Sequence, residues 1–110
     1  MGYDEESISS AITIRRFGKV RMLSLNKAPV DSAGVVYKPA AKDKPSVLSN
    51  TESLYQFAFF ENTSVQYFPG YIQVYPTDRS FRARAIFSQS VITPNSGAMY
   101  GTFCYLVDNY

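Results

Sequence analysis

The chain contains no histidine and only one cysteine, Cys104. Histidine is the usual general base near neutral pH and the commonest ligand of transition metals. Its absence therefore excludes Ser-His-Asp and Cys-His catalytic arrangements and histidine-containing zinc sites. One thiol can form neither an internal disulfide nor a CxxC pair. P-loop, GxSxG and EF-hand motifs are also missing. We therefore expect no enzyme activity, no metal site and no cofactor.

Long apolar runs and blocks of basic residues are missing too. No stretch approaches the roughly 20 apolar residues of a transmembrane helix, so no membrane insertion is expected. The start, MGYDEESISS, is acidic and polar and lacks the regions of a signal peptide. The net charge is +2, and the basic residues are scattered rather than arranged in the basic stripe typical of nucleic-acid binders. We expect no nucleic-acid partner.

Aromatic residues are abundant, as nine tyrosines and eight phenylalanines without tryptophan. Tyrosine suits half-wet surfaces, because its ring packs while its hydroxyl stays hydrogen-bonded. A thin domain of 110 residues has little room to bury so many rings. The composition therefore predicts that some of them lie at an interface.

Short alternating segments, separated by proline and glycine, predict about eight strands and no long helix. The expected strands are 11–17, 20–26, 34–38, 54–61, 65–68, 71–75, 81–87 and 100–107. Residues 1–10 are expected to be a flexible lead-in or linker, and residues 11–110 a single domain. This pattern is typical of an all-β, jelly-roll-like antiparallel β-sandwich.

Local signals refine this outline. Gly18-Lys19 and Pro69-Gly70 are predicted turns. Residues 39–53 read as a polar loop that has room for one helical turn, with cap-like chemistry at Asn50-Thr51-Glu52. The last strand, 100–107, is expected to be buried on nearly both faces, with Cys104 as a small buried hydrophobic residue.

The segment 81–87 (FRARAIF) alternates most clearly. Its predicted core-facing residues are Phe81, Ala83, Ala85 and Phe87, while Arg82 and Arg84 point the other way.

Aromatic and charged residues are interleaved between positions 67 and 84. The candidate ligand-binding residues are Tyr67, Tyr71, Tyr75, Asp78, Arg79 and Arg82. Flat rings beside charged donors and acceptors suit a saccharide, and tyrosine and arginine are also enriched at protein interfaces. A solvated strand face with ordinary cross-strand tyrosine pairs explains the same pattern. All three interpretations stay open at this point.

Three segments carry a resemblance to a known family. Residues 16–20 (RFGKV), continuing as VRMLSLN, come first. The second is 70–75 (GYIQVY), followed by a turn and FRARAIF, and the third is 97–106 (GAMYGTFCYL). In this order they resemble the C-terminal domains of phage tail-fibre and baseplate proteins, over roughly residues 12–107.

The resemblance implies a non-enzymatic structural or receptor-binding module of a virion, made in the bacterial cytoplasm. Such domains form trimeric heads or fibre tips, and many bind cell-wall saccharides. We therefore expect a homotrimer with tyrosines at its subunit contacts, other tail or baseplate proteins as partners, and a host saccharide as ligand. The alternatives are a carbohydrate-binding module detached from a larger enzyme and a small hydrolase that uses a pair of carboxylates.

Overall fold

The computed structural model describes residues 3–46 and 53–108. They contain eight strands and one short 3₁₀ turn. The elements are β1 (Tyr3–Ser7), β2 (Ile12–Phe17), β3 (Val20–Ala28), β4 (Val35–Tyr37), η1 (Ala41–Asp43), β5 (Leu54–Glu61), β6 (Tyr67–Val74), β7 (Phe81–Ala85) and β8 (Ala98–Leu106). The prediction of an all-β chain with about eight short strands is confirmed, while the jelly-roll topology stays a prediction.

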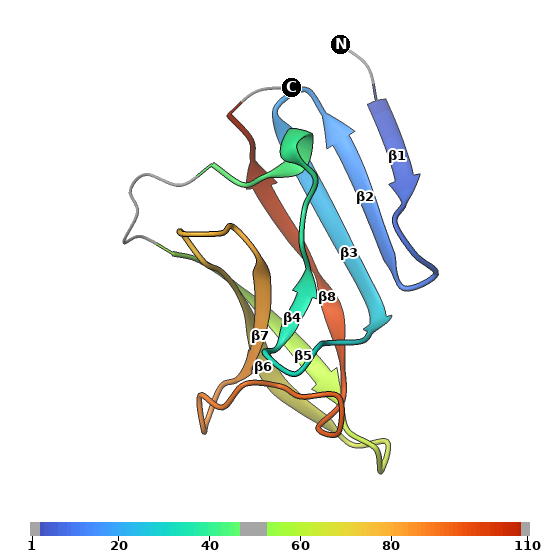
Figure 1. Cartoon of the computed structure of the whole chain (residues 1–110). Coiled ribbons are helices and arrows are strands. Elements are labelled where there is room, and N and C mark those ends of the chain that lie inside the picture. Colours follow the sequence, from blue (N-terminus) through green and yellow to red (C-terminus); the bar gives the residue numbers. More distant parts are fainter. Residues whose placement is uncertain (1–2, 47–52, 109–110) are drawn as a thin grey trace.

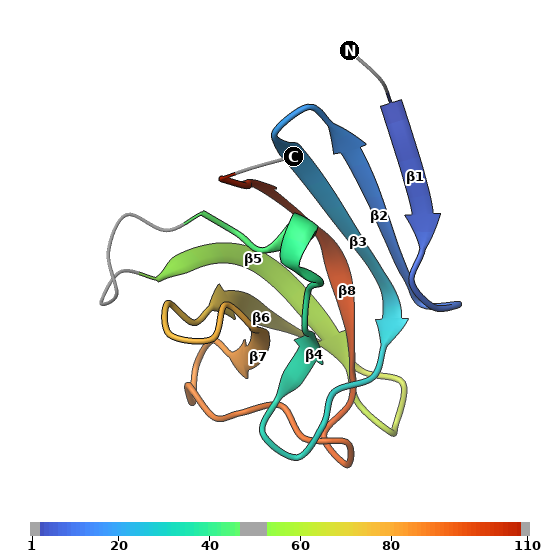
Figure 2. The same cartoon turned by 45° about the horizontal axis from the view of Figure 1, so that its top comes forward.

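All eight strands belong to one antiparallel sheet in the order β1-β2-β3-β8-β5-β6-β7-β4. The sheet curls, so that β7 and β4 face β3 and β8 (Figures 1 and 2). Ring contacts confirm this, because Phe81 on β7 lies 5.2 Å from both Phe103 and Tyr105 on β8, measured between ring centroids. The two halves of one sheet therefore enclose a sandwich-like core.

The curl begins where β5 leaves β8. β5 pairs with β8 only through Phe59–Glu61 and then continues beside β6. Gly101 follows the paired stretch of β8 with a φ of 152°, a conformation that favours glycine. A Cβ at this position would lie 3.3 Å from the Ala58 side chain. Just after β8 ends, Val107 forms an isolated bridge with Pro45.

The inner face of the curled sheet forms the core. Ile14, Leu23 and Phe81 are completely buried there, and Ala83 is buried as predicted. β8 alternates rather than being buried on both faces: Phe103 and Tyr105 point inward, whereas Cys104 is exposed. The prediction of a buried Cys104 is therefore wrong, because the outer face of β8 has no covering layer in the described structure.

The predicted strand 81–87 ends early, at Ala85. Residues 86–88 form a turn, and the Phe87 side chain is 88% exposed, so its assignment to the core is wrong. Alternation continues in the sequence beyond the strand, but the chain turns away after Ala85 and Arg84 instead forms an isolated bridge with Val91. Ala85 itself is partly buried against the core.

Two segments predicted as irregular are strands. Residues 3–7, within the expected lead-in, form the edge strand β1. Pro69-Gly70 lies inside β6 and joins the predicted strands 65–68 and 71–75. The Pro69 carbonyl accepts a hydrogen bond from the Ile86 amide, on the side of the strand that faces away from β5. Because the N–H and C=O of a strand residue point to the same side, the N–H that Pro69 lacks would also face away from β5, and the hydrogen bonds between β5 and β6 are not interrupted. Gly70 allows β7 to approach, because a Cβ there would lie 2.9 Å from the Arg84 carbonyl oxygen.

The predicted hairpin at Gly18-Lys19 is confirmed, since Phe17 pairs with Val20 and Gly18 has a φ of 57°. The one helical turn of the predicted loop lies at Ala41–Asp43. The cap-like residues 50–52 lie outside the described residues.

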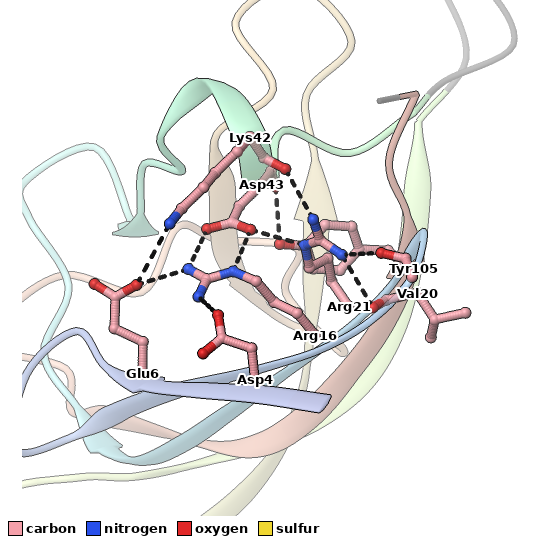
Figure 3. A network of polar contacts seen from close by, with 9 residues as sticks. Asp4, Glu6, Arg16, Val20, Arg21, Lys42, Asp43 and Tyr105 are labelled. Atoms are coloured by element: carbon pink, nitrogen blue, oxygen red, sulfur yellow. Dashed lines mark hydrogen bonds and ion pairs between the residues drawn. The ribbon is translucent and has the colours of Figure 1, made fainter. Parts of the chain in front are cut away.

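A buried ion network attaches η1 to the sheet (Figure 3). The Asp43 carboxylate is 1% exposed and accepts two bonds from Arg16, at 2.9 and 2.8 Å, and one from Arg21 at 2.8 Å. Arg16 also binds Asp4 and Glu6 of β1, at 2.6 and 2.7 Å. One guanidinium thus connects the edge strand, the sheet interior and the 3₁₀ turn.

Neutral acceptors complete this network. Arg21 donates to the Gly18 carbonyl at 2.6 Å and to the Lys42 carbonyl at 3.2 Å, and the Tyr105 hydroxyl donates to the Asp43 carbonyl at 2.9 Å. Burial alone would raise the pKa of the Asp43 carboxyl. The bonds from Arg16 and Arg21 outweigh burial and hold that pKa below its usual value.

Phe81→Ala should lower the free energy of unfolding by about 3–5 kcal/mol, as for other fully buried phenylalanines. Phe81 contacts the rings of Tyr37, Phe103 and Tyr105, so the truncation leaves a cavity in the centre of the core. Phe87→Ala is the matched control and should change stability by less than about 0.5 kcal/mol. Urea unfolding followed by circular dichroism measures both, and equal losses would contradict this assignment of the core.

Asp43→Asn should lower the free energy of unfolding at pH 7 by about 3–5 kcal/mol, because buried Arg21 loses the carboxylate with which it pairs and buried Arg16 keeps only the more exposed carboxylates of Asp4 and Glu6. The pKa of Asp43 is lowered by folding, so its contribution is complete above the unfolded pKa of about 4 and is lost as the pH falls through the folded value. Unfolding from pH 7 to pH 2 should therefore show a weaker acid dependence in the variant. Asp108→Asn, at an exposed carboxylate, is the control, and an Asp43 variant with the acid dependence of the wild type would contradict the prediction.

Candidate functional site

Large aromatic side chains gather on the outer, convex face of β5, β6 and β8. Tyr55, Phe57 and Phe59 occupy alternate positions on β5 and are 63%, 71% and 43% exposed. The register places them beside outward residues of β6 and β8. We define the outer aromatic face as Tyr55, Phe57, Phe59, Tyr67, Tyr71 and Tyr100.

The rings of this face support one another in two groups. Phe59 stacks on Tyr100 with a centroid distance of 5.2 Å and an interplanar angle of 8°, and Tyr67 meets the Phe59 ring edge-on at 5.9 Å. Tyr55 contacts Tyr71 at 5.9 Å. Phe57 lies between the two groups on β5. The contacts hold the rings in place without hiding them from solvent, so the face is a preformed platform.

A buried carboxylate lies at one end of the platform. Glu61 is 8% exposed and accepts hydrogen bonds from the hydroxyls of Tyr100, at 2.9 Å, and Tyr67, at 3.3 Å. The charge of Glu61 raises the pKa of the Tyr67 phenol. Burial and the bond to Glu61 raise the pKa of Tyr100 as well. Both phenols therefore stay neutral and donate hydrogen bonds to the buried Glu61 carboxylate.

A basic cluster lies at the opposite end. The Arg82 guanidinium carbon lies 3.8 Å from the Tyr75 ring centroid, and Arg84 Nη2 donates to the Tyr75 hydroxyl at 2.5 Å. Arg82 also pairs with Asp78 at 2.8 Å. The hydrogen bond from Arg84 lowers the pKa of the Tyr75 phenol. Asp78 accepts from both the amide and the hydroxyl of Ser80, so the turn positions this carboxylate.

An aliphatic strip continues the outer face across β8, β3 and β2. Leu106 is opposite Val20, and Val20 is opposite Phe17, and these side chains are 58%, 41% and 38% exposed. Cys104 is exposed on the same face, opposite Met22. We define the aliphatic strip as Phe17, Val20, Met22, Cys104 and Leu106. Both regions lie on the same side of the sheet, and on β8 the exposed Thr102, opposite Ser24, lies between Tyr100 and Cys104.

The structure divides the six predicted site residues into three groups. Tyr71, Tyr75, Asp78 and Arg82 lie together at the basic end of the outer face. Tyr67 lies at the other end of β6, bonded to Glu61. Arg79 leaves the face, because its Nη1 donates to the Pro45 carbonyl at 3.1 Å and pairs with Asp108 at 3.3 Å, so it ties the end of β8 to the 45–46 segment.

Sequence reasoning missed the aromatic residues of β5 and the role of Arg84. The alternation of Tyr55, Phe57 and Phe59 is visible in LYQFAFFE, but the adjacent Phe60 makes its period ambiguous. Pairing with β6 resolves the ambiguity, since Phe60 stacks on Phe68 on the inner side. Arg84 was predicted to point outward, and only the fold places Tyr71 directly opposite it.

Within residues 3–46 and 53–108, no three acidic or cysteine side chains lie close enough together to hold a metal ion. The same residues include no helix with the length and apolar character needed to cross a membrane.

Comparison with protein-family models, with curated protein sequences and with solved structures found no match to this chain. The resemblance to phage tail domains consequently stays a hypothesis. The arguments for function that follow depend on the chemistry of the outer face.

Proposed function

We propose that this chain is a non-enzymatic contact module that assembles with further copies of itself through its outer face, as a structural or receptor-binding part of a phage tail fibre or baseplate. The observation that carries the assembly is the uncovered apolar surface formed by the outer aromatic face and the aliphatic strip. The virion setting, the host saccharide and a copy number of three are supplied by the sequence resemblance.

The exposed side chains favour a protein partner. Soluble monomers seldom leave a large continuous apolar surface in water, and such surfaces commonly mark interaction sites. Here Phe57, Val20 and Leu106 are all more than 40% exposed on one face of a small chain. Aromatic residues and methionine are enriched in the buried centre of interfaces, which fits this composition.

The size of the face suits an interface between folded domains. The molecule measures 43 × 31 × 19 Å, and a standard interface buries roughly 800 Å² of each partner. A mostly apolar hollow of about 500 Å³, whose lining includes Phe57, Phe59, Tyr67 and Pro69, gives room for side chains of a neighbouring copy. Closed rings of identical contacts are an ordinary outcome of such self-association.

A second candidate function is saccharide binding at the basic end, favoured by the tyrosines and arginines gathered there. In an assembled head these sites would be repeated, and multivalency would raise a weak affinity for a host surface. A carbohydrate-binding module attached to an enzyme would use the same residues as a monomer. Sedimentation therefore distinguishes an assembled tail module from a monomeric carbohydrate-binding module. A turnover assay on polysaccharides tests the third possibility, a hydrolase.

Phe57→Arg should convert the assembled protein into monomers, because it places a charge in the centre of the apolar surface. Sedimentation velocity at micromolar concentration measures the effect. The matched control is Phe87→Arg, since Phe87 is 88% exposed but lies in the turn after β7. A wild type that sediments as a monomer, or two variants that assemble equally well, would contradict assembly through this face.

Cys104 should report the same association chemically. Its thiol is exposed in the single chain and should react with Ellman's reagent in dilute solution. As the protein concentration rises, assembly should cover the thiol and slow the reaction, whereas in Phe57→Arg the rate should not depend on concentration. An unchanged wild-type rate across the range in which the protein assembles would show that the aliphatic strip lies outside the interface.

A further inference from the structure

Arg84 differs from the other five arginines in its partners. Arg15, Arg16, Arg21, Arg79 and Arg82 each form an ion pair with an aspartate or glutamate. Among the described residues Arg84 has no carboxylate partner and bonds only to neutral oxygens, the Gln89 carbonyl at 3.0 Å and the Tyr75 hydroxyl at 2.5 Å. Its charge is thus held in place without an acidic group among the described residues to neutralise it.

The contacts of Arg84 leave donors available. Two of its five guanidinium N–H groups are used by Gln89 and Tyr75. Nε is buried and has no partner, and one N–H on each of the two Nη atoms is left without an acceptor among the described residues, in a side chain that is half-buried. Arginine is well suited to carboxylates and phosphates, because its planar fork binds two oxygens at once. A fixed guanidinium without a counter-charge is therefore suited to an anionic group.

Flat rings lie beside this charge. Tyr71 is the cross-strand partner of Arg84 and contacts the Tyr55 ring, which is 63% exposed. Gln73 Nε2 donates to the Tyr55 hydroxyl at 3.3 Å and to Ser53 Oγ at 3.2 Å, which helps to fix the tyrosine. Rings of this kind take the apolar side of a sugar, while nearby polar groups meet its hydroxyls.

We propose that Arg84, Tyr71 and Tyr55 form a subsite for an acidic saccharide, in which the guanidinium binds a carboxylate or phosphate and the rings contact the adjoining sugar. The inference rests on the proposed role of the outer face as a contact surface and specifies a ligand class for its basic end. Arg82 stays engaged with Asp78 and the Tyr75 ring and positions Tyr75, which in turn positions Arg84.

The probes are chosen so that charge is the main variable. Tetragalacturonate carries carboxylates, its methyl ester is the same sugar chain without charge, and glucose 1-phosphate carries a phosphate on a sugar ring. Amide chemical shifts of the whole chain are followed during titration with each probe. At least one acidic probe should bind with an affinity of about millimolar to micromolar, with shifts at Tyr71 and Arg84, and the ester should bind about tenfold more weakly or worse. The acidic probe that binds more tightly identifies the source of the anion.

Arg84→Gln should weaken binding of that probe by about tenfold or more, and Arg84→Lys should restore only part of it, because lysine keeps the charge but not the fork. Arg79→Gln is the matched control and should bind as the wild type does, since Arg79 leaves the face. Tyr71→Ala gives an independent test if Arg84→Gln unfolds, which thermal unfolding would show.

The proposal is overturned if neither acidic probe binds, if tetragalacturonate binds and its methyl ester binds as tightly, or if a folded Arg84→Gln or Tyr71→Ala variant binds like the wild type. Sedimentation of Phe57→Arg is independent of these results. Loss of the saccharide subsite and failure of the assembly proposal are therefore distinguishable.

Discussion

Arg16 and Arg21 lie on neighbouring strands and point into the curled sheet, where hydrophobic residues occupy most other positions. They are compatible with this core because the carboxylate of Asp43 reaches both (Figure 3). A buried charge that lost its partner would be strongly destabilising. The 3₁₀ turn that carries Asp43 must therefore stay against β2 and β3, and this constraint closes one side of the core.

The same network explains why β1 is part of the sheet. An isolated edge strand of acidic and polar residues has little apolar surface to bury, but Asp4 and Glu6 meet the Arg16 guanidinium from β1. Ion pairs between Arg16 and these two acidic residues therefore help to attach β1 to the sheet, where hydrophobic contacts are few. Charged residues also protect an exposed edge against pairing with other chains. The assembly that we propose accordingly uses the face of the sheet rather than this edge.

The outer face has the opposite character. Its centre is apolar, its acidic end is satisfied internally by two tyrosine hydroxyls, and its basic end holds one guanidinium without a carboxylate partner among the described residues. A surface of this kind favours apolar contact over the centre and anion binding at the basic end. Tyr55 and Tyr71 belong both to the outer aromatic face and to the proposed subsite, so assembly and ligand binding occupy adjoining parts of one face and share these two rings.

The sequence by itself determined the all-β class, most strand positions and the hairpin at Gly18-Lys19, because alternation and turn residues are local signals. Local signals also misled: Phe87 follows the alternation but lies beyond the strand, and Pro69-Gly70 resembles a turn but lies within one. Only the tertiary structure decided which face is covered. It brought Asp43 to Arg16, aligned Tyr71 with Arg84 and left Cys104 in solvent, since these relations depend on how strands distant in sequence are paired and on how the sheet curls.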